Sequence, residues 1–394
     1  MATMLADSGP TLPDEVVQHA VVRGALESPW IWRSLLLITL VVGYLLFRPR
    51  AREQSLATKL VVVATMLGLS GMTWLNSYVG YVRTPYDLAV LMQRGSGWAA
   101  QFGAALASMT GPEATAPAPG SAAQHGAPAP GPVQDVQVRK IALPDPGNGV
   151  PTGMTNVMLP RGYDAPENRT KRYPVVYLVH GYPAGSSDDW FTSGDALATM
   201  QELVRGGLVQ PMIVVAPDMQ AGVATADWEC LNVPRGPQLE TYLTRTVTAA
   251  IDSRFRTIPD RAHRALGGMS GGGFCALNSG LRNLDRYGTL LVSLPYDTPG
   301  DATALLSGHP DLLRANTPRD YIPTMRFTAP VAVMLSAGEN AQTDMTTARR
   351  IKRALEQRGQ QVFMRFEPNL NHTWRTARAA LPYMLAYANE QFPH

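Results

Sequence analysis

The stretch ALGGMSGGG, Ala265–Gly273, decides the fold. A short apolar run leads into a turn that fits G-x-S-x-G with Ser270 at its centre, and a helical pattern starts at Phe274. Where a strand turns this sharply into a helix, side chains beside the serine would collide, so glycines flank it. The pattern predicts Ser270 as a nucleophile held at the end of a strand. A glycine-rich turn without catalytic function is the alternative, and the surrounding sequence decides between them.

Apolar, β-branched runs alternate with helical patterns on both sides of this turn. Alternation of this kind over about 250 residues predicts a doubly wound, mostly parallel α/β sheet. The predicted buried strands, besides Ala265–Leu266, are Val175–Val179, Met212–Ala216 and Val331–Leu335, and the helical patterns are Gly194–Val204, Leu239–Phe255, Thr346–Arg358 and Thr376–Phe392.

The loop after the strand at Val175–Val179 supplies a second part of the predicted site. It reads His180-Gly181-Tyr182-Pro183. An oxyanion hole needs two backbone N–H groups that are fixed before the reaction starts. We expect one from Gly271, directly after the nucleophile, and the other from Tyr182. His180 is predicted to shape this loop rather than to transfer protons.

A general base and its acid are predicted near the C-terminus, because this fold orders its triad as serine, acid, histidine. Of the seven histidines, only His372 follows a late strand-like segment, Val362–Glu367, and precedes the last helical pattern. The acid should follow the strand at Val331–Leu335, where both Glu339 and Asp344 are found.

Two apolar runs, Trp30–Phe47 and Leu60–Val79, precede this domain. Each has close to the ~20 residues needed to cross ~30 Å of hydrocarbon. The short loop between them is rich in arginine, so the positive-inside rule predicts a cytoplasmic loop with both chain termini outside. A pair of buried core helices is the alternative. A cleaved signal peptide fits less well, because the first run starts late and a second follows at once.

The chain divides into five predicted segments. A polar N-terminal tail (1–29) precedes two transmembrane helices (30–83). An amphipathic segment (84–110) lies on the membrane or forms a shallow third helix, and a Pro/Ala/Gly linker (111–135) leads to the catalytic domain (136–394). An extended linker of this composition spans ~3.1 Å per residue, which would hold the domain up to about 70 Å from the bilayer.

Composition excludes several classes of protein. A net charge of +3 is too small to indicate nucleic-acid binding. Two cysteines exclude a disulfide-rich scaffold and a multi-cysteine zinc site. No cofactor is predicted, since the motifs for phosphate, dinucleotide and metal binding are missing from the sequence. Cys230 and Cys275 are expected at the same end of the sheet and would pair in an exported domain.

Three segments resemble the esterase D and antigen 85 branch of the α/β-hydrolases. They are YPVVYLVHGYPAGSSDDWF (173–191), GGMSGGGFCAL (267–277) and NHTW (371–374). The resemblance covers residues ~139–392. A closer one, to actinobacterial membrane-anchored esterases, includes LNSYVGYVRTP (75–85) and DWECLNVPRGPQLETYLTRTV (227–247).

The resemblance bears on the acid of the triad. In antigen 85 proteins the acid lies six residues beyond the glycine that ends its strand, and counting from Gly338 gives Asp344. The commoner offset of three falls on Ala341, which cannot serve. The resemblance therefore favours Asp344 and leaves Glu339 as the alternative. It implies a two-step acyl transfer through an acyl-enzyme.

The functional expectation is a membrane-anchored serine esterase outside the cytoplasm, acting on envelope lipid esters. An acyltransferase with the same triad is one alternative. A catalytically inactive hydrolase-fold scaffold in the envelope is the other. Tethering favours a substrate within the membrane plane, because it raises the effective concentration only of molecules confined there.

The first testable prediction concerns topology. A single reactive cysteine at position 55 (Ser55→Cys) should resist a membrane-impermeant thiol reagent in intact cells, because the basic loop is cytoplasmic. Permeabilised cells are the control and should be labelled. Labelling without permeabilisation would refute the predicted orientation.

Overall fold

The computed structural model describes residues 9–49, 55–94, 136–183, 185–223 and 226–393. Its eight strands are β1 (Gln137–Ala142), β2 (Met154–Leu159), β3 (Val175–Val179), β4 (Ile213–Pro217), β5 (Arg264–Met269), β6 (Thr289–Ser293), β7 (Ala332–Gly338) and β8 (Gln361–Glu367). They form one sheet in the order β1-β2-β4-β3-β5-β6-β7-β8. Only β2 runs antiparallel to its neighbours, β1 and β4. The predicted doubly wound, mostly parallel sheet is confirmed.

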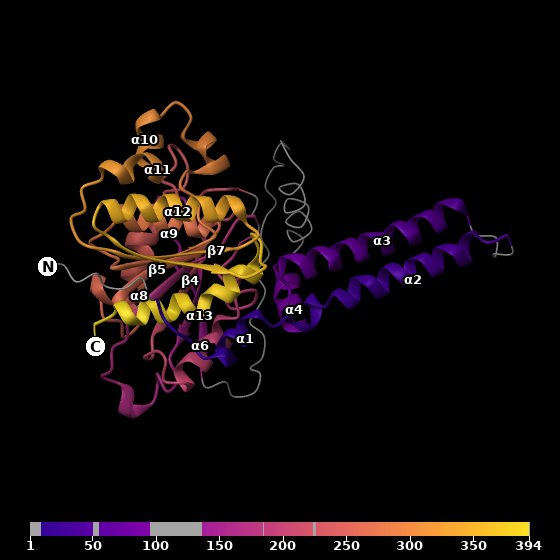
Figure 1. Ribbon diagram of the computed structural model, residues 1–394, viewed down its shortest axis with the longest axis horizontal. Helices are drawn as coiled ribbons and strands as arrows, with labels where there is room; N and C mark the ends of the chain where they lie inside the picture. Colours follow the sequence, from indigo (N-terminus) through magenta and orange to yellow (C-terminus); the bar gives the residue numbers. More distant parts are fainter. Residues whose placement is uncertain (1–8, 50–54, 95–135, 184, 224–225, 394) are drawn as a thin grey trace.

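Helices cover both faces of this sheet (Figure 1). One face packs against α8 (Thr248–Arg254), α9 (Gly271–Arg282) and α12 (Gln342–Gln357). The other packs against α1 (Asp14–Val21), α6 (Ala196–Arg205) and α13 (Trp374–Gln391). The central strands β3, β4 and β6 are buried along their whole length, as β-branched strands of a parallel sheet with two covered faces should be. Three short helices, α7 (Leu239–Thr241), α10 (Pro310–Ala315) and α11 (Pro318–Tyr321), lie in the connections.

Two long helices, α2 (Pro29–Phe47) and α3 (Leu56–Val79), form a hairpin that projects from the domain (Figure 1). Both are long and apolar enough to cross a membrane, and only 6% of each apolar window is buried within the protein. Contiguous apolar patches larger than a few hundred Å² mark interaction sites for a membrane or for another protein. Ser55 caps the start of α3 through the N–H of Thr58, and Gly80 ends the helix with a φ of 74°. Residues 50–54 of the basic loop lie outside the described residues.

The N-terminal segment is part of the folded domain, which differs from the polar tail expected from the sequence. Helix α1 packs on α13 and buries Val16 and Ala20. Beyond it, the carboxylate of Glu27 accepts hydrogen bonds from Arg378 of α13 at 2.8 and 3.1 Å. Both side chains are fully buried. Val16 and Ala20 lie four residues apart, so they form one face of α1, and this face packs on the domain.

The segment after α3 is also bound to the domain. The phenol of Tyr81 donates to the buried carboxylate of Asp189, which also accepts from Arg94 at 2.9 Å. Arg83 pairs with Asp195 at 2.6 Å, and the hydroxyl of Ser193 donates to the carbonyl oxygen of Tyr81 at 2.7 Å. Helix α4 (Pro85–Gln93) lies between these contacts.

These contacts change the expected role of the linker. The sequence suggests a domain held at a distance by an extended tether, but polar contacts on both sides of the hairpin join the domain directly to its end. The linker at 111–135, and residues 95–110 of the amphipathic segment, fall outside the described residues. The position of the domain is thus set by folded contacts rather than by tether length.

The second prediction concerns the buried ion pair. Glu27→Gln should leave the charge of Arg378 buried with only backbone carbonyl oxygens as partners. Removing the opposite charge from a buried pair costs roughly 3–5 kcal/mol. For a domain of this size the thermal midpoint should fall by about 10 °C, measured on the full-length protein in detergent. Glu15→Gln, on the exposed side of α1, is the matched control and should leave the midpoint unchanged. Equal midpoints for the two variants would show that the pair contributes nothing to stability.

Candidate active site

The turn at Ser270 has the geometry that its glycines suggest. Ser270 sits between β5 and α9 with φ 56° and ψ −122°, and its N–H donates to the carbonyl oxygen of Ser293 at 3.0 Å. A Cβ atom on Gly268 would clash with the backbone of Gly272, and one on Gly272 would clash with the carbonyl oxygen of Val179. A positive φ is unfavourable for serine, so close packing of the backbone must hold it.

The structure brings three of the predicted site residues together. The Nε2 atom of His372 lies 2.9 Å from the hydroxyl oxygen of Ser270. Its Nδ1 atom lies 2.7 Å from a carboxylate oxygen of Asp344. Ser270 and Asp344 are buried, whereas the side chain of His372 is one-third exposed. A hydroxyl, an imidazole and a carboxylate in this order can activate the hydroxyl as a nucleophile.

The second candidate acid points elsewhere. Glu339 is exposed, and its carboxylate accepts from the N–H of Asn369 at 3.4 Å. Asp344 lies in the first turn of α12, and that position brings its carboxylate to the ring of His372. The geometry therefore favours Asp344, as the six-residue offset does.

Tyr296 is a site residue that the sequence analysis missed. Its ring stacks on that of His372 with centroids 5.7 Å apart, and its hydroxyl lies 3.4 Å from both Ser270 Oγ and His372 Nε2. Burial raises the pKa of this phenol to about 12, so the phenol stays neutral at physiological pH. Tyr296 follows β6, a strand that was not predicted. The apolar run at Thr289–Ser293 is the signal that could have identified this strand and, with it, the loop that carries Tyr296.

Both predicted oxyanion residues lie beside the nucleophile. Gly271 is the first residue of α9, where backbone N–H groups have no partner within the helix. Tyr182 lines the same cavity as Ser270. A Cβ atom on the preceding Gly181 would lie 3.3 Å from that of Ser270, so the loop passes close to the nucleophile.

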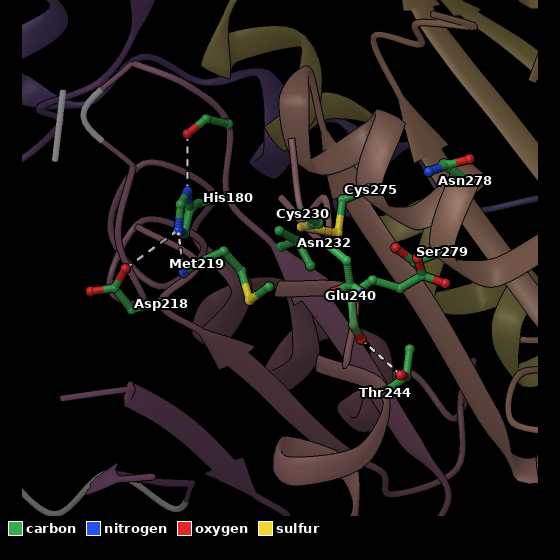
Figure 2. Close-up of a disulfide and its surroundings, with 12 residues drawn as sticks. His180, Asp218, Met219, Cys230, Asn232, Glu240, Thr244, Cys275, Asn278 and Ser279 are labelled. Atoms are coloured by element: carbon green, nitrogen blue, oxygen red, sulfur yellow. Dashed lines mark hydrogen bonds and ion pairs between the residues drawn. A yellow bond between two sulfur atoms is a disulfide. The ribbon is translucent and has the colours of Figure 1, made fainter. Parts of the chain in front are cut away.

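His180 is buried and tied to the backbone (Figure 2). Its Nε2 atom accepts from the N–H of Met219 at 3.0 Å, and its Nδ1 atom lies 3.0 Å from the carbonyl oxygen of Gly181. Both ring nitrogens are thus engaged with loop backbone. The expectation that His180 shapes the loop is confirmed.

Figure 2 also shows the predicted disulfide between Cys230 and Cys275. It joins the loop after β4 to the first turns of α9, closing a separation of 45 residues. Glu229 and Cys230 have positive φ values of 43° and 53°. The bond therefore fixes a strained part of this loop beside the helix that carries the nucleophile.

A cavity of about 900 Å³ opens over Ser270, His372 and Asp344. One wall is apolar and is formed by the helical hairpin and the segment that follows it, rather than by the hydrolase domain. It contains Leu75, Tyr78 and Val79 of α3, together with Leu91 of α4. The end of a candidate membrane helix thus contributes directly to the space in front of the nucleophile.

Another part of the cavity lining is acidic and contains Asp227, Glu229 and Asp301. Burial, followed by the neighbouring Asp227, raises the pKa of Glu229 well above its ordinary value. Burial likewise raises the pKa of Asp227 to about 6. Within the described part of the chain, no group of His, Cys, Asp and Glu side chains converges as a metal site.

The family model Esterase, described as "Putative esterase", matches residues 153–387. A ferulic acid esterase structure superposes with a TM-score of 0.57 at 23% identity, over 66% of this chain and 99% of that one. An S-formylglutathione hydrolase from Agrobacterium tumefaciens gives a TM-score of 0.53 at 16% identity, over 66% of this chain and 95% of that one. Likeness at this identity concerns the fold.

Curated relatives match over shorter stretches. An endo-1,4-beta-xylanase/feruloyl esterase of Xylanibacter ruminicola is 32% identical over 136 residues, which are 34% of this chain and 18% of that protein. Esterase Rv1288 of Mycobacterium tuberculosis is 35% identical over 123 residues, 31% of this chain and 24% of that protein. The chain therefore spans about a fifth to a quarter of the length of these relatives.

The fold and these matches define the class of protein, a carboxylic ester hydrolase of the α/β-hydrolase type. Its sheet carries one reversed strand, and its nucleophile candidate stands at the turn from β5 to α9. The match to the family model covers more than half of the chain. The chain belongs to the Esterase family.

The third prediction tests the acid. Asp344→Asn should lower kcat for ester hydrolysis by about 10³- to 10⁴-fold, because the imidazole is then held in the wrong tautomer. Glu339→Gln should stay close to wild type. The measurement is initial-rate kinetics on full-length protein in detergent, with thermal unfolding to establish that both variants fold. The reverse ranking would assign the role to Glu339.

Proposed function

We propose that this protein is a membrane-anchored serine esterase that hydrolyses ester-linked lipids at the outer surface of the membrane. The observation that carries the proposal is the composition of the cavity: the end of α3 and the residues around Ser270 line the same space. A substrate lying along α3 would reach the nucleophile without leaving the apolar surface. Membership of the Esterase family supports hydrolysis over acyl transfer.

The proposed mechanism has two steps. In the first, His372 takes the proton of Ser270 as Oγ attacks the ester carbonyl carbon, and Asp344 orients the ring. The N–H groups of Gly271 and Tyr182 stabilise the negative charge on the carbonyl oxygen. The bond to the alcohol then breaks, and the alcohol leaves with the proton from His372.

The second step releases the acyl group. Water attacks the acyl-enzyme while His372 accepts its proton, and the acid departs as Ser270 recovers its hydrogen. Tyr296 stacks on the imidazole ring throughout. We assign it the role of holding that ring between Ser270 and Asp344.

The proposed anchoring rests on the hairpin. Helices of 19 and 24 residues span about 29 and 36 Å, enough for ~30 Å of hydrocarbon. The folded segments 9–27 and 80–94 flank the hairpin and both contact the domain, which supports an arrangement with both on the same side of the bilayer. The basic loop at the other end supports a cytoplasmic position for that loop.

The fourth prediction concerns the substrate. In the native host, Ser270→Ala should cause at least one ester-linked envelope lipid to accumulate, because its hydrolysis stops. The measurement is mass spectrometry of total lipids. Ser253→Ala, an exposed serine on α8, is the matched control and should leave the lipid profile of the wild type.

Short soluble esters should be turned over slowly by the wild type, since they offer no remote binding energy to align the carbonyl group. Covalent labelling of Ser270 by a fluorophosphonate would separate an active enzyme from an inactive scaffold. An unchanged lipid profile together with efficient cleavage of soluble esters would refute a lipid substrate.

A further inference from the structure

Three carboxyl groups in the active-site cavity lack a cationic partner. Asp227 and Glu229 lie on the loop between β4 and α7, and Asp301 lies in the 3-10 turn Gly300–Leu306 that follows β6. Among the described lysines, arginines and histidines, none forms an ion pair with any of the three. The side chains of Asp227 and Glu229 hydrogen-bond to each other, and one further oxygen of each is buried without a hydrogen-bond partner. Glu229 is itself only 9% exposed.

The carboxyl group of Glu229 is fixed beside the reacting atoms. A Cβ atom on Gly271 would lie 3.0 Å from its Oε1 atom and 3.2 Å from its Oε2 atom. The disulfide at Cys230, the next residue, ties this loop to α9. Glu229 thus borders the side of Ser270 on which the carbonyl oxygen of a substrate would be held.

Of the three, Glu229 is buried, Asp227 is half-buried and Asp301 is exposed. A buried carboxylate is costly unless it is paired, so a cation on a ligand would stabilise the ionised form of Glu229. We propose that Glu229, with Asp227 and Asp301, forms a subsite for a primary ammonium group on the acyl part of the ester. The substrate is then an aminoacyl ester of a lipid alcohol rather than a fatty acyl ester. This inference rests on the proposed function and narrows its substrate class.

The dimensions of an α-amino acid suit this arrangement. In such an ester the ammonium nitrogen lies about 2.5 Å from the carbonyl carbon, by standard bond lengths and angles. With that carbon at Ser270 Oγ and its oxygen towards the N–H of Gly271, an ammonium group this close to the carbonyl carbon would be within reach of Glu229, whose carboxyl group borders Gly271. A fatty acyl chain would instead place methylene groups against the carboxyl groups. In the aminoacyl ester, the lipid alcohol would lie against the apolar wall formed by Leu75, Tyr78, Val79 and Leu91.

The electrostatics of the cavity favour a cation as its ligand. Burial raises the pKa of Tyr182, and the carboxylates of Asp227 and Asp301 raise it further, so these acids face the oxyanion loop as well as each other. Crowding of like charges is relieved when a cation enters. The three carboxyl groups do not converge as a metal site within the described chain, which favours an ammonium group over a divalent ion.

The reaction balances without a further reactant. The bond between Ser270 Oγ and the aminoacyl carbonyl carbon forms as the bond from that carbon to the lipid oxygen breaks. The lipid alcohol leaves with the proton carried by His372. Water then cleaves the aminoacyl-enzyme, so the products are a free amino acid and the lipid alcohol.

The fifth prediction compares two matched esters. The alanyl and propionyl esters of dioleoylglycerol differ in one ammonium group, and each is presented in phosphatidylcholine vesicles to the full-length enzyme. The wild type should favour the alanyl ester by at least about tenfold in kcat/KM, as expected for a charge-assisted contact. Glu229→Gln, which keeps the shape but cannot ionise to pair with the ammonium group, should reduce this ratio towards one.

Controls separate the possible failures. Asp285→Asn, an exposed acid on the segment before β6, should keep the ratio of the wild type, and fluorophosphonate labelling of Ser270 reports folding of every variant. Equal turnover of both esters by the wild type would overturn the ammonium subsite and leave the esterase intact. A ratio unchanged in Glu229→Gln, or activity that requires added Ca²⁺, would also overturn it. Absence of both turnover and labelling would instead refute the proposed function.

Discussion

The chain passes from strand β5 into helix α9 at Ser270, which has a φ of 56° that serine does not favour. The turn is possible because Gly268 and Gly272 lack side chains, so the carbonyl group of Val179 at the end of β3 can approach within contact distance. The N–H of Ser270 is held by Ser293 at the end of β6. The ends of three parallel strands therefore meet around Ser270, and Met269 of β5 together with Gly181 and Tyr296 of the following loops lines the cavity.

The helix that starts at this turn organises the rest of the site. Its first N–H groups face the nucleophile, and Cys275 one turn later binds the loop that carries Glu229. His372 and Asp344 reach the same point from the ends of β8 and β7, because parallel strands present their C-terminal ends at one edge of the sheet. The candidate triad and the carboxyl group of Glu229 thus lie together at one edge of the sheet.

The helical hairpin contributes the apolar wall of the cavity at this edge of the sheet. Glu27 and Arg378 exclude water from the contact between the N-terminal segment and α13. Breaking such a pair would leave a charge buried, so the contact resists separation. In a second polar contact, the carboxylate of Asp189 accepts hydrogen bonds from Tyr81 and Arg94. Because both contacts hold the segment at the end of α3, including Gly80 and Tyr81, the apolar wall from α3 has a fixed position relative to Ser270.

The sequence by itself determined those features that depend on neighbouring residues. Glycines around Ser270 identified the turn, and β-branched runs identified the central strands β3 and β4 to within a residue. The order of serine, acid and histidine selected His372, and the two apolar helices were evident from length and composition. Strands β1, β2 and β6 were not predicted. Strand β1 is largely exposed, and the apolar run of β2 is interrupted by Thr155 and Asn156.

Only the tertiary structure decided the relations between distant segments. It brought Asp344 rather than Glu339 to His372, stacked Tyr296 on the imidazole, and placed Glu229 beside Gly271. It also packed α1 on α13, although residues 1–29 read as a polar tail. Local patterns record how a segment buries its own apolar face. They do not record which charges will meet across the fold, because those pairs are separated by tens to hundreds of residues.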